Sequence, residues 1–176
     1  INIFRMKHKA GFVNIIGVPN VGKSTLCNSL VGERLSIITS KAQTTRHRIF
    51  GIVNAPEHQI IFSDTPGILK PSYKLHEKMM SFVAEAFQDA DIFLFLTDIF
   101  DDSTPEDTYV KKLANAKVPV LLVINKIDLA DEKKLNEKIS YWKNLLPNAE
   151  IIPLSALKGT NVEKVMPRIL ELLPEN

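Results

Sequence analysis

The stretch GVPNVGKS, residues 17–24, constrains this chain more than any other part of its sequence. It follows the apolar run 12–16, which is typical of a buried strand, and it precedes a segment with the pattern of a helix. Glycines near both ends of the stretch allow the backbone to curl, so that N–H groups turn inward at the start of the helix. A strand, a glycine-rich turn and a helix in this order predict a cradle for phosphate groups.

Six apolar runs are typical of β-strands, and helical patterns follow most of them. The runs cover residues 12–16, 49–53, 59–62, 92–96, 118–124 and 150–152. Strands that alternate with helices predict a parallel sheet with helices on both faces. Only the short turn 54–58 joins the second and third runs, which predicts a hairpin and one antiparallel strand. The expected fold is therefore α/β, of the P-loop NTPase class, with a six-stranded, mostly parallel sheet.

Length and composition describe one ordinary globular domain. The chain has 176 residues, of which 45% are hydrophobic and 24% charged, enough for one well-buried core. No apolar run reaches the roughly 18 residues that a membrane-spanning helix needs. The single cysteine, Cys27, lies among apolar residues at helical spacing and is interpreted as a packed thiol, which suits a reducing cytoplasm. The net charge of +2 is too small to indicate nucleic-acid binding, although residues 34–48 form a local basic cluster.

Three helices are predicted from local patterns in the second half of the chain. Apolar residues at helical spacing run through 135–146 and again through 162–173. In the stretch STPED, Thr104 is expected to cap a helix whose first residue is Pro105.

Two side chains of the phosphate cradle have predicted roles. Lys23 is expected to neutralise the outer phosphates, and Ser24 to present its hydroxyl to a Mg²⁺ ion that bridges them. The residues expected to contact a nucleotide here are Asn20, Val21, Gly22, Lys23, Ser24 and Thr25. The alternative is an ordinary glycine-rich turn with an exposed lysine. The cradle alone does not distinguish ATP from GTP.

The tetrapeptide NKID, residues 125–128, resembles the guanine-recognition motif of GTPases and follows the buried run 118–124. The Asp128 carboxylate can accept hydrogen bonds from the ring N–H and the exocyclic amine of guanine, a pair that adenine lacks. Asn125 is expected to support the base and the loop, and the stem of Lys126 to lie along the ring. The alternative is a helix-start aspartate beside a surface asparagine and lysine.

A second loop is expected to complete the base site. The stretch SALKG, residues 155–159, follows the last predicted strand. Its backbone N–H at Ala156 is expected to donate to the guanine oxygen, with Ser155 and Leu157 beside it. Together with the phosphate cradle, these loops favour GTP over ATP.

The stretch DTPG, residues 64–67, matches the D-x-x-G element of GTPases. Asp64 is expected to hold Mg²⁺ through water, and the Gly67 N–H to sense the γ-phosphate. The stretch SKAQTTRHR, residues 40–48, is expected to supply a threonine for Mg²⁺, with Thr45 favoured over Thr44. The predicted metal ligands are therefore Ser24, Thr45 and Asp64. An ordinary Pro-Gly turn is the alternative reading of DTPG.

The stretches GVPNVGKSTLCNSL, ITSKAQTTRHRIFGI, DTPGI and NKID together resemble the GTPase domain of the Era family, bacterial ribosome-assembly GTPases of the TrmE-Era-EngA-Septin-like class. The resemblance implies a Ras-like G domain over residues 9–174, preceded by a disordered leader, or residues added for expression, at 1–8. Members of the family carry a C-terminal KH-type RNA-binding domain. We expect this chain to be a GTPase-domain fragment that lacks it.

The resemblance implies a GTP-binding and GTP-hydrolysing switch in assembly and maturation of the small ribosomal subunit. The implied cofactors are GTP or GDP, Mg²⁺ and additionally K⁺. The implied partners are the guanine nucleotide and, through the full-length protein, 16S rRNA and the small subunit. We expect a cytoplasmic monomer without a transmembrane segment, and leave open a peripheral association at the inner membrane face.

Slow intrinsic hydrolysis is expected because Ile68 stands where Ras-like GTPases carry the glutamine that orients water. Asn20 matches the asparagine that helps to bind K⁺ in related GTPases. The residues expected to act in hydrolysis are Lys23, Asn20, Thr45 and Gly67. Two alternatives remain open. One is a nucleotide sensor with negligible hydrolysis. The other is the G domain of a related tRNA-modification or ribosome-assembly GTPase, although those relatives carry GTTRD where this chain has QTTRH.

Overall fold

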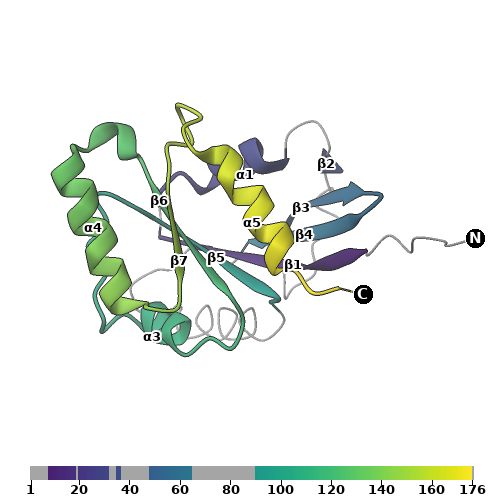
Figure 1. Cartoon of the computed structure of the whole chain (residues 1–176), viewed down its shortest axis with the longest axis horizontal. Coiled ribbons are helices and arrows are strands. Elements are labelled where there is room, and N and C mark those ends of the chain that lie inside the picture. Colours follow the sequence, from purple (N-terminus) through teal and green to yellow (C-terminus); the bar gives the residue numbers. More distant parts are fainter. Residues whose placement is uncertain (1–7, 19, 32–34, 37–47, 65–89, 176) are drawn as a thin grey trace, which may run out of the picture.

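The computed structural model describes residues 8–18, 20–31, 35–36, 48–64 and 90–175. A central sheet has the strand order β2-β3-β4-β1-β5-β6-β7 (Figure 1). The strands are β1 (Lys9–Gly17), β2 (Leu35–Ser36), β3 (Arg48–Ala55), β4 (His58–Asp64), β5 (Ile92–Asp98), β6 (Val120–Asn125) and β7 (Glu150–Pro153). The α-helices are α1 (Lys23–Val31), α3 (Thr108–Ala114), α4 (Glu132–Leu145) and α5 (Val165–Leu172), and η3 (Ile127–Leu129) and η4 (Val162–Lys164) are short 3₁₀ turns.

All six predicted strands are present, and the predicted hairpin is the pair β3–β4. Strand β3 runs antiparallel to both of its neighbours, whereas β4, β1, β5, β6 and β7 pair in parallel. The sequence did not predict β2, which adds a seventh strand of two residues at the edge. A strand that short carries no apolar run, and only its pairing with β3 defines it.

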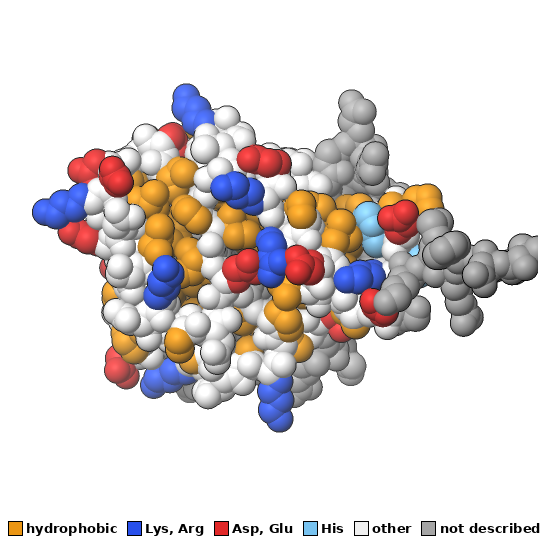
Figure 2. Space-filling model, viewed as in Figure 1, with side chains coloured by type: hydrophobic (Ala, Val, Ile, Leu, Met, Phe, Trp, Pro, Cys, Tyr) orange, Lys and Arg blue, Asp and Glu red, His pale blue; other side chains and the backbone are white. Residues whose placement is uncertain are grey.

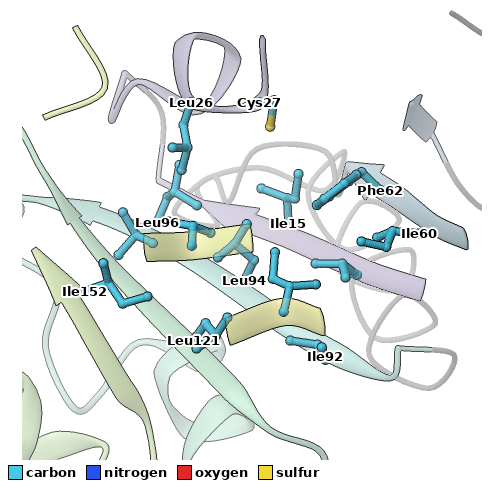
Figure 3. Packing of buried hydrophobic residues seen from close by; sticks show 14 of the residues in the cluster. Ile15, Leu26, Cys27, Ile60, Phe62, Ile92, Leu94, Leu96, Leu121 and Ile152 are labelled. Carbon is cyan, nitrogen blue, oxygen red and sulfur yellow. The ribbon is translucent and has the colours of Figure 1, made fainter. Parts of the chain in front are cut away.

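Helices cover both faces of the sheet, as predicted. Strand β5 illustrates the division, because its seven residues are all buried and alternate between the two faces. Ile92, Leu94 and Leu96 belong to the core under α1 and α5 (Figure 3). Phe93 and Phe95 belong to the core under α3 and α4. The fully buried β5 therefore lies between two separate hydrophobic layers.

Cys27 lies in the first of these layers, where Figure 3 places it beside Leu26 on α1. Its exposed fraction is 2%, which confirms the interpretation as a packed thiol. Every helix within the described ranges is too short or too polar to cross a lipid bilayer.

The helix expected to begin at Pro105 begins three residues later. Helix α3 starts at Thr108, and its N-cap residue is Asp107 in an extended conformation. The Asp107 carboxylate accepts a hydrogen bond from the backbone N–H of Thr104 at 2.8 Å, which closes a turn in front of the helix. Thr104 therefore does not cap the helix, because the aspartate side chain bonds backward to the chain instead.

The edge strand β7 lies open between α4 and α5, where Figure 2 shows apolar side chains gathered. A groove of about 500 Å³ runs between β7 and α5, and Ile151, Pro153 and Pro167 contribute to its lining. Pro153 has no N–H, and its carbonyl accepts from the Asn161 side chain at 3.0 Å. The end of this edge strand is therefore poorly suited to pairing with another strand.

We predict that Phe95→Ala lowers the free energy of unfolding by about 3–5 kcal/mol, the usual cost of a large cavity in a core. Phe95 is fully buried, and its ring lies 5.3 Å from that of Trp142 and 5.8 Å from that of Tyr109. Urea unfolding followed by circular dichroism measures the loss. The control is Phe100→Ala, because Phe100 is 56% exposed and its removal should change the value by no more than about 0.5 kcal/mol. Equal losses in both variants would contradict this account of the core.

Candidate functional site

The loops predicted to be functional meet at one edge of the sheet. Strands β1, β5, β6 and β7 are parallel neighbours, so their carboxyl ends lie along the same edge (Figure 1). The cradle 17–24 follows β1, the stretch 125–128 closes β6, and the stretch 155–159 follows β7. Ligands of open α/β sheets bind at this edge.

The phosphate cradle forms a cleft of about 320 Å³ at the start of α1. Its lining consists of Gly17, Val18, Asn20, Gly22, Lys23, Ser24 and Thr25. The helix begins at Lys23, and the first backbone bond of its opening turn runs from the Leu26 N–H to the Gly22 carbonyl at 3.0 Å. Backbone N–H groups in the first turn of a helix have no partner within the helix and carry partial positive charge. The cleft therefore has the geometry and the polarity of an anion site.

Gly22 is the glycine on which the cradle depends. Its φ is +90°, and a Cβ atom at this position would lie 2.3 Å from the Asn125 side-chain nitrogen. A Cβ atom on Gly17 would instead make ordinary contacts, the nearest at 3.4 Å from Val21. Asn20 also has a positive φ, of 66°. The tight bend predicted from two glycines is thus made at Asn20 and Gly22.

The side chain of Asn125 ties three loops together. It is 4% exposed, and its amide donates to the Val21 carbonyl at 2.8 Å. Its carbonyl oxygen accepts from the Ala156 N–H at 3.0 Å. The asparagine amide carries both an NH₂ donor group and a carbonyl acceptor, so one side chain can serve both partners. Asn125 therefore supports the loops, whereas its predicted support of the base stays a prediction. The Ala156 N–H, which was expected to donate to guanine, donates to Asn125 in this structure.

Lys126 connects the stretch 125–128, called the base loop from here on, to the phosphate cradle. Its backbone is left-handed, with φ of 65°, and its ammonium group donates to the Asn20 carbonyl at 2.7 Å. The same ammonium group lies 2.9 Å from a carboxylate oxygen of Asp98, the last residue of β5. Asp98 is not among the residues predicted from the sequence. The sequence feature that could have indicated Asp98 is an acidic residue that follows a buried run, because ligands bind at the edge of the sheet where such strands end.

The carboxylate of Asp128 is held in place by a neighbouring hydroxyl. Asp128 is exposed in the turn η3, and one of its oxygens accepts from the Ser155 hydroxyl at 2.9 Å. Ser155 is 1% exposed and also accepts from the Lys158 N–H at 3.2 Å. Leu157 lies beside them with 78% of its surface exposed. The stretch 125–128 and the loop after β7 therefore face one another.

Several of the remaining predicted residues lie outside the described part of the chain. Thr44, Thr45, Gly67 and Ile68 lie outside the described residues, and so do residues 1–7 of the predicted leader. Asp64 is the last residue of β4, but its side chain is outside the described part as well. Ser24 is exposed at the start of α1 within the cleft. Within the ranges that the structure describes, no group of three or more His, Cys, Asp or Glu residues is arranged to bind a metal.

Residues 12–126, which include the cradle and the start of the base loop, match the family described as 50S ribosome-binding GTPase. The chain belongs to this family. It is 42% identical over 170 residues to GTPase Era of Staphylococcus epidermidis, covering 96% of this chain and 57% of that protein. It is also 42% identical over 171 residues to GTPase Era of Alkaliphilus metalliredigens, covering 97% and 58%. The chain therefore spans less than two thirds of the length of these curated relatives.

Solved structures of the family share the fold. Aquifex aeolicus Era bound to GDP·AlF₄⁻ matches with a TM-score of 0.74 and 42% identity, covering 96% of this chain and 58% of that chain. A complex of Era with MgGDPNP and nucleotides 1506–1542 of 16S ribosomal RNA matches with a TM-score of 0.76 and 41% identity, over the same shares. These matches confirm the predicted P-loop G-domain fold and the resemblance to the Era family.

We predict that Gly22→Ala destabilises the fold more than Gly159→Ala. Both glycines have a positive φ, of +90° and +72°, so both variants suffer the strain of about 1–2 kcal/mol that a side chain meets there. Only at Gly22 does the new Cβ overlap a side chain, whereas the space around Gly159 is open to 4 Å. Displacing Asn125 breaks buried hydrogen bonds and should cost a further 1–3 kcal/mol, roughly. Urea unfolding of both variants tests this difference, and equal destabilisation would argue against the close packing of Gly22 on Asn125.

Proposed function

We propose that this chain is the G domain of a ribosome-assembly GTPase, which binds guanine nucleotides and slowly hydrolyses GTP to GDP and phosphate. One observation carries the proposal: the Asn125 amide and the Lys126 ammonium group join the base loop to the phosphate cradle. Two loops joined in this way can bind the base and the phosphates of one nucleotide at the same time. The family match over residues 12–126 supports the same assignment.

The base is selected by hydrogen bonds in this proposal. A carboxylate has about four acceptor positions, and the Ser155 hydroxyl takes one on Asp128. The remaining positions are sufficient for the ring N–H and the exocyclic amine of guanine. The Ala156 N–H donates to the guanine oxygen by sharing its present bond with Asn125. The exposed Leu157 and the stem of Lys126 then cover the ring.

The phosphates occupy the cleft at the start of α1. Residues 20–25 surround them, the N–H groups of the cradle bind their oxygens, and the Lys23 ammonium group offsets the charge of the outer phosphates. Ser24, Thr45 and Asp64 are proposed to hold Mg²⁺, and hydroxyl and carboxylate oxygens are suitable ligands for this ion. When bound, Mg²⁺ withdraws negative charge from the β- and γ-phosphate oxygens. The exposed Ser24 hydroxyl in the cleft fits that position.

Hydrolysis transfers the γ-phosphoryl group to water, and the bond between the γ-phosphorus and the bridging oxygen breaks. The Gly67 N–H is proposed to bind the γ-phosphate, so that loss of this group releases its loop. An isoleucine side chain at position 68 cannot orient the attacking water, and the intrinsic rate is therefore slow. Asn20, which lines the cleft, is proposed to bind a K⁺ ion beside the phosphates.

The proposed pathway is maturation of the small ribosomal subunit. A structural relative, Era, has been solved with a 16S ribosomal RNA segment and MgGDPNP, and it shares 41% identity with this chain. We therefore propose 16S rRNA and the small subunit as partners of the full-length protein. We further propose that the protein is a monomer in the cytoplasm, and leave open a peripheral association at the inner membrane face.

We predict that Asp128→Asn weakens GDP binding by about 10²-fold or more and strengthens binding of XDP. The NH₂ group of the new asparagine can donate to the xanthine oxygen that replaces the guanine amine. With guanine, the same NH₂ group faces the exocyclic amine, and two donors repel one another. Isothermal titration with GDP and XDP measures both changes. The control is Asp131→Asn, because Asp131 caps α4 and asparagine is an equally good cap. Unchanged GDP affinity in Asp128→Asn would remove Asp128 from the base site.

We predict that GTP hydrolysis with Mg²⁺ is at least about tenfold faster in KCl than in NaCl at equal ionic strength, because a fixed cation offsets charge that develops in the transition state. Asn20→Ala should abolish this difference. Asn28→Ala, at an exposed position of α1, should leave it unchanged. Equal, barely detectable rates in both salts would contradict the K⁺ proposal and favour a nucleotide sensor that needs a partner for hydrolysis.

A further inference from the structure

Asp98 is a buried acid that the proposed catalytic cycle does not use. It is the last residue of β5, a strand whose seven residues are all buried, and 5% of Asp98 is exposed. Its position at the carboxyl end of β5 places it at the edge where the nucleotide loops meet. A charged group in this environment needs a partner, because removing a carboxylate from water is costly.

Both oxygens of the Asp98 carboxylate have partners. One accepts from the Phe100 N–H at 2.8 Å, which fixes the chain as it leaves β5. The other lies 2.9 Å from the Lys126 ammonium group, in an ion pair whose side chains are 7% and 31% exposed. Lys126 in turn donates to the Asn20 carbonyl at 2.7 Å. A continuous chain of contacts therefore leads from β5 through the base loop to the phosphate cradle.

Lys126 and Asn20, the second and third residues of this chain of contacts, both have strained backbones. Lys126 has φ of 65° and Asn20 has φ of 66°, and neither is a glycine. Such conformations cost free energy and persist where the surrounding contacts fix them. The Lys126 ammonium group contacts Asp98 on one side and Asn20 on the other, so it restrains both loops at once.

We propose that Asp98 is a positioning residue of the guanine nucleotide site, which holds Lys126 so that its stem can cover the base while its ammonium group fixes the phosphate cradle. The inference rests on the proposed function. Without the Asp98 carboxylate, the lysine side chain loses its buried partner and can turn toward solvent or toward the exposed ring of Phe100, 6.0 Å away. Part of the binding free energy must then order Lys126 and the cradle.

The experiment is a double-mutant cycle on GDP affinity with Asp98→Asn, Lys126→Gln and the double variant. Asp98→Asn is nearly isosteric, and its amide oxygen can still accept from the Phe100 N–H while its NH₂ group faces the ammonium group. We expect each single variant to raise the GDP Kd about tenfold, within the usual range of coupling between sites. The double variant should bind no more weakly than Lys126→Gln alone, because Asp98 acts through Lys126.

The matched control is Asp91→Asn at the opposite end of β5. The Asp91 carboxylate also accepts a backbone N–H, from Phe12 at 2.8 Å, but it lies at the amino end of the strand, away from the nucleotide loops. This variant should bind GDP with the affinity of the unaltered chain. Circular dichroism and thermal unfolding verify that each variant is folded before its Kd is measured.

Each outcome separates this inference from the proposed function. Absence of GDP binding by the unaltered chain overturns the proposed function itself. Three outcomes overturn only the role of Asp98 when the unaltered chain binds GDP normally. They are an unchanged GDP Kd in Asp98→Asn, an unchanged GDP Kd in Lys126→Gln, and additive losses of affinity in the double variant. If Asp98→Asn does not fold, Asp98→Glu replaces it, because glutamate keeps the charge but moves it by one methylene. A raised Kd in Asp98→Glu then supports the inference, and an unchanged Kd overturns it.

Discussion

A single buried amide holds the site together. Asn125 donates to the Val21 carbonyl and accepts from the Ala156 N–H, so three loops that are far apart in sequence share one side chain. Both backbone groups would lose a hydrogen-bond partner without it, at a cost of roughly 1–3 kcal/mol each. The Gly22 backbone passes so close to this amide that a Cβ atom has no room. The shape of the phosphate cleft thus depends on a residue of the base loop.

The packing of the sheet holds this arrangement in place. Strands β5 and β6 are buried along their whole lengths between two hydrophobic layers, and both end at the edge that carries the loops. Asp98 and Asn125 are paired in the register of these strands, as their last residues. A polar pair at the ends of two buried strands is held in position by the packing of everything behind it.

Much of this protein follows from local patterns in the chain. The six apolar runs, the hairpin at β3–β4 and the order of the loops were all predicted, because hydrophobic periodicity and glycine-rich turns act over a few residues. Predictions that depended on the competition between neighbouring side chains were less successful. Helix α3 begins at Thr108 because Asp107 bonds back to Thr104, and no local pattern distinguishes that arrangement from a threonine cap.

The motifs and the alternation of strands with helices were sufficient to indicate the fold class and the phosphate cradle, since both depend on residue type and spacing, and the resemblance of NKID to the guanine-recognition motif is the basis of the proposed guanine nucleotide. Only the tertiary structure decided which side chains that are far apart in the sequence contact one another. The Lys126 ammonium group donates to the carbonyl of Asn20, which is 106 residues away along the chain. The same group pairs with the carboxylate of Asp98 at the end of β5, the strand next to β6. The sequence shows the type of each of these residues but not that they contact one another. Their mutual contacts arise only because parallel strands bring their carboxyl ends to one edge of the sheet.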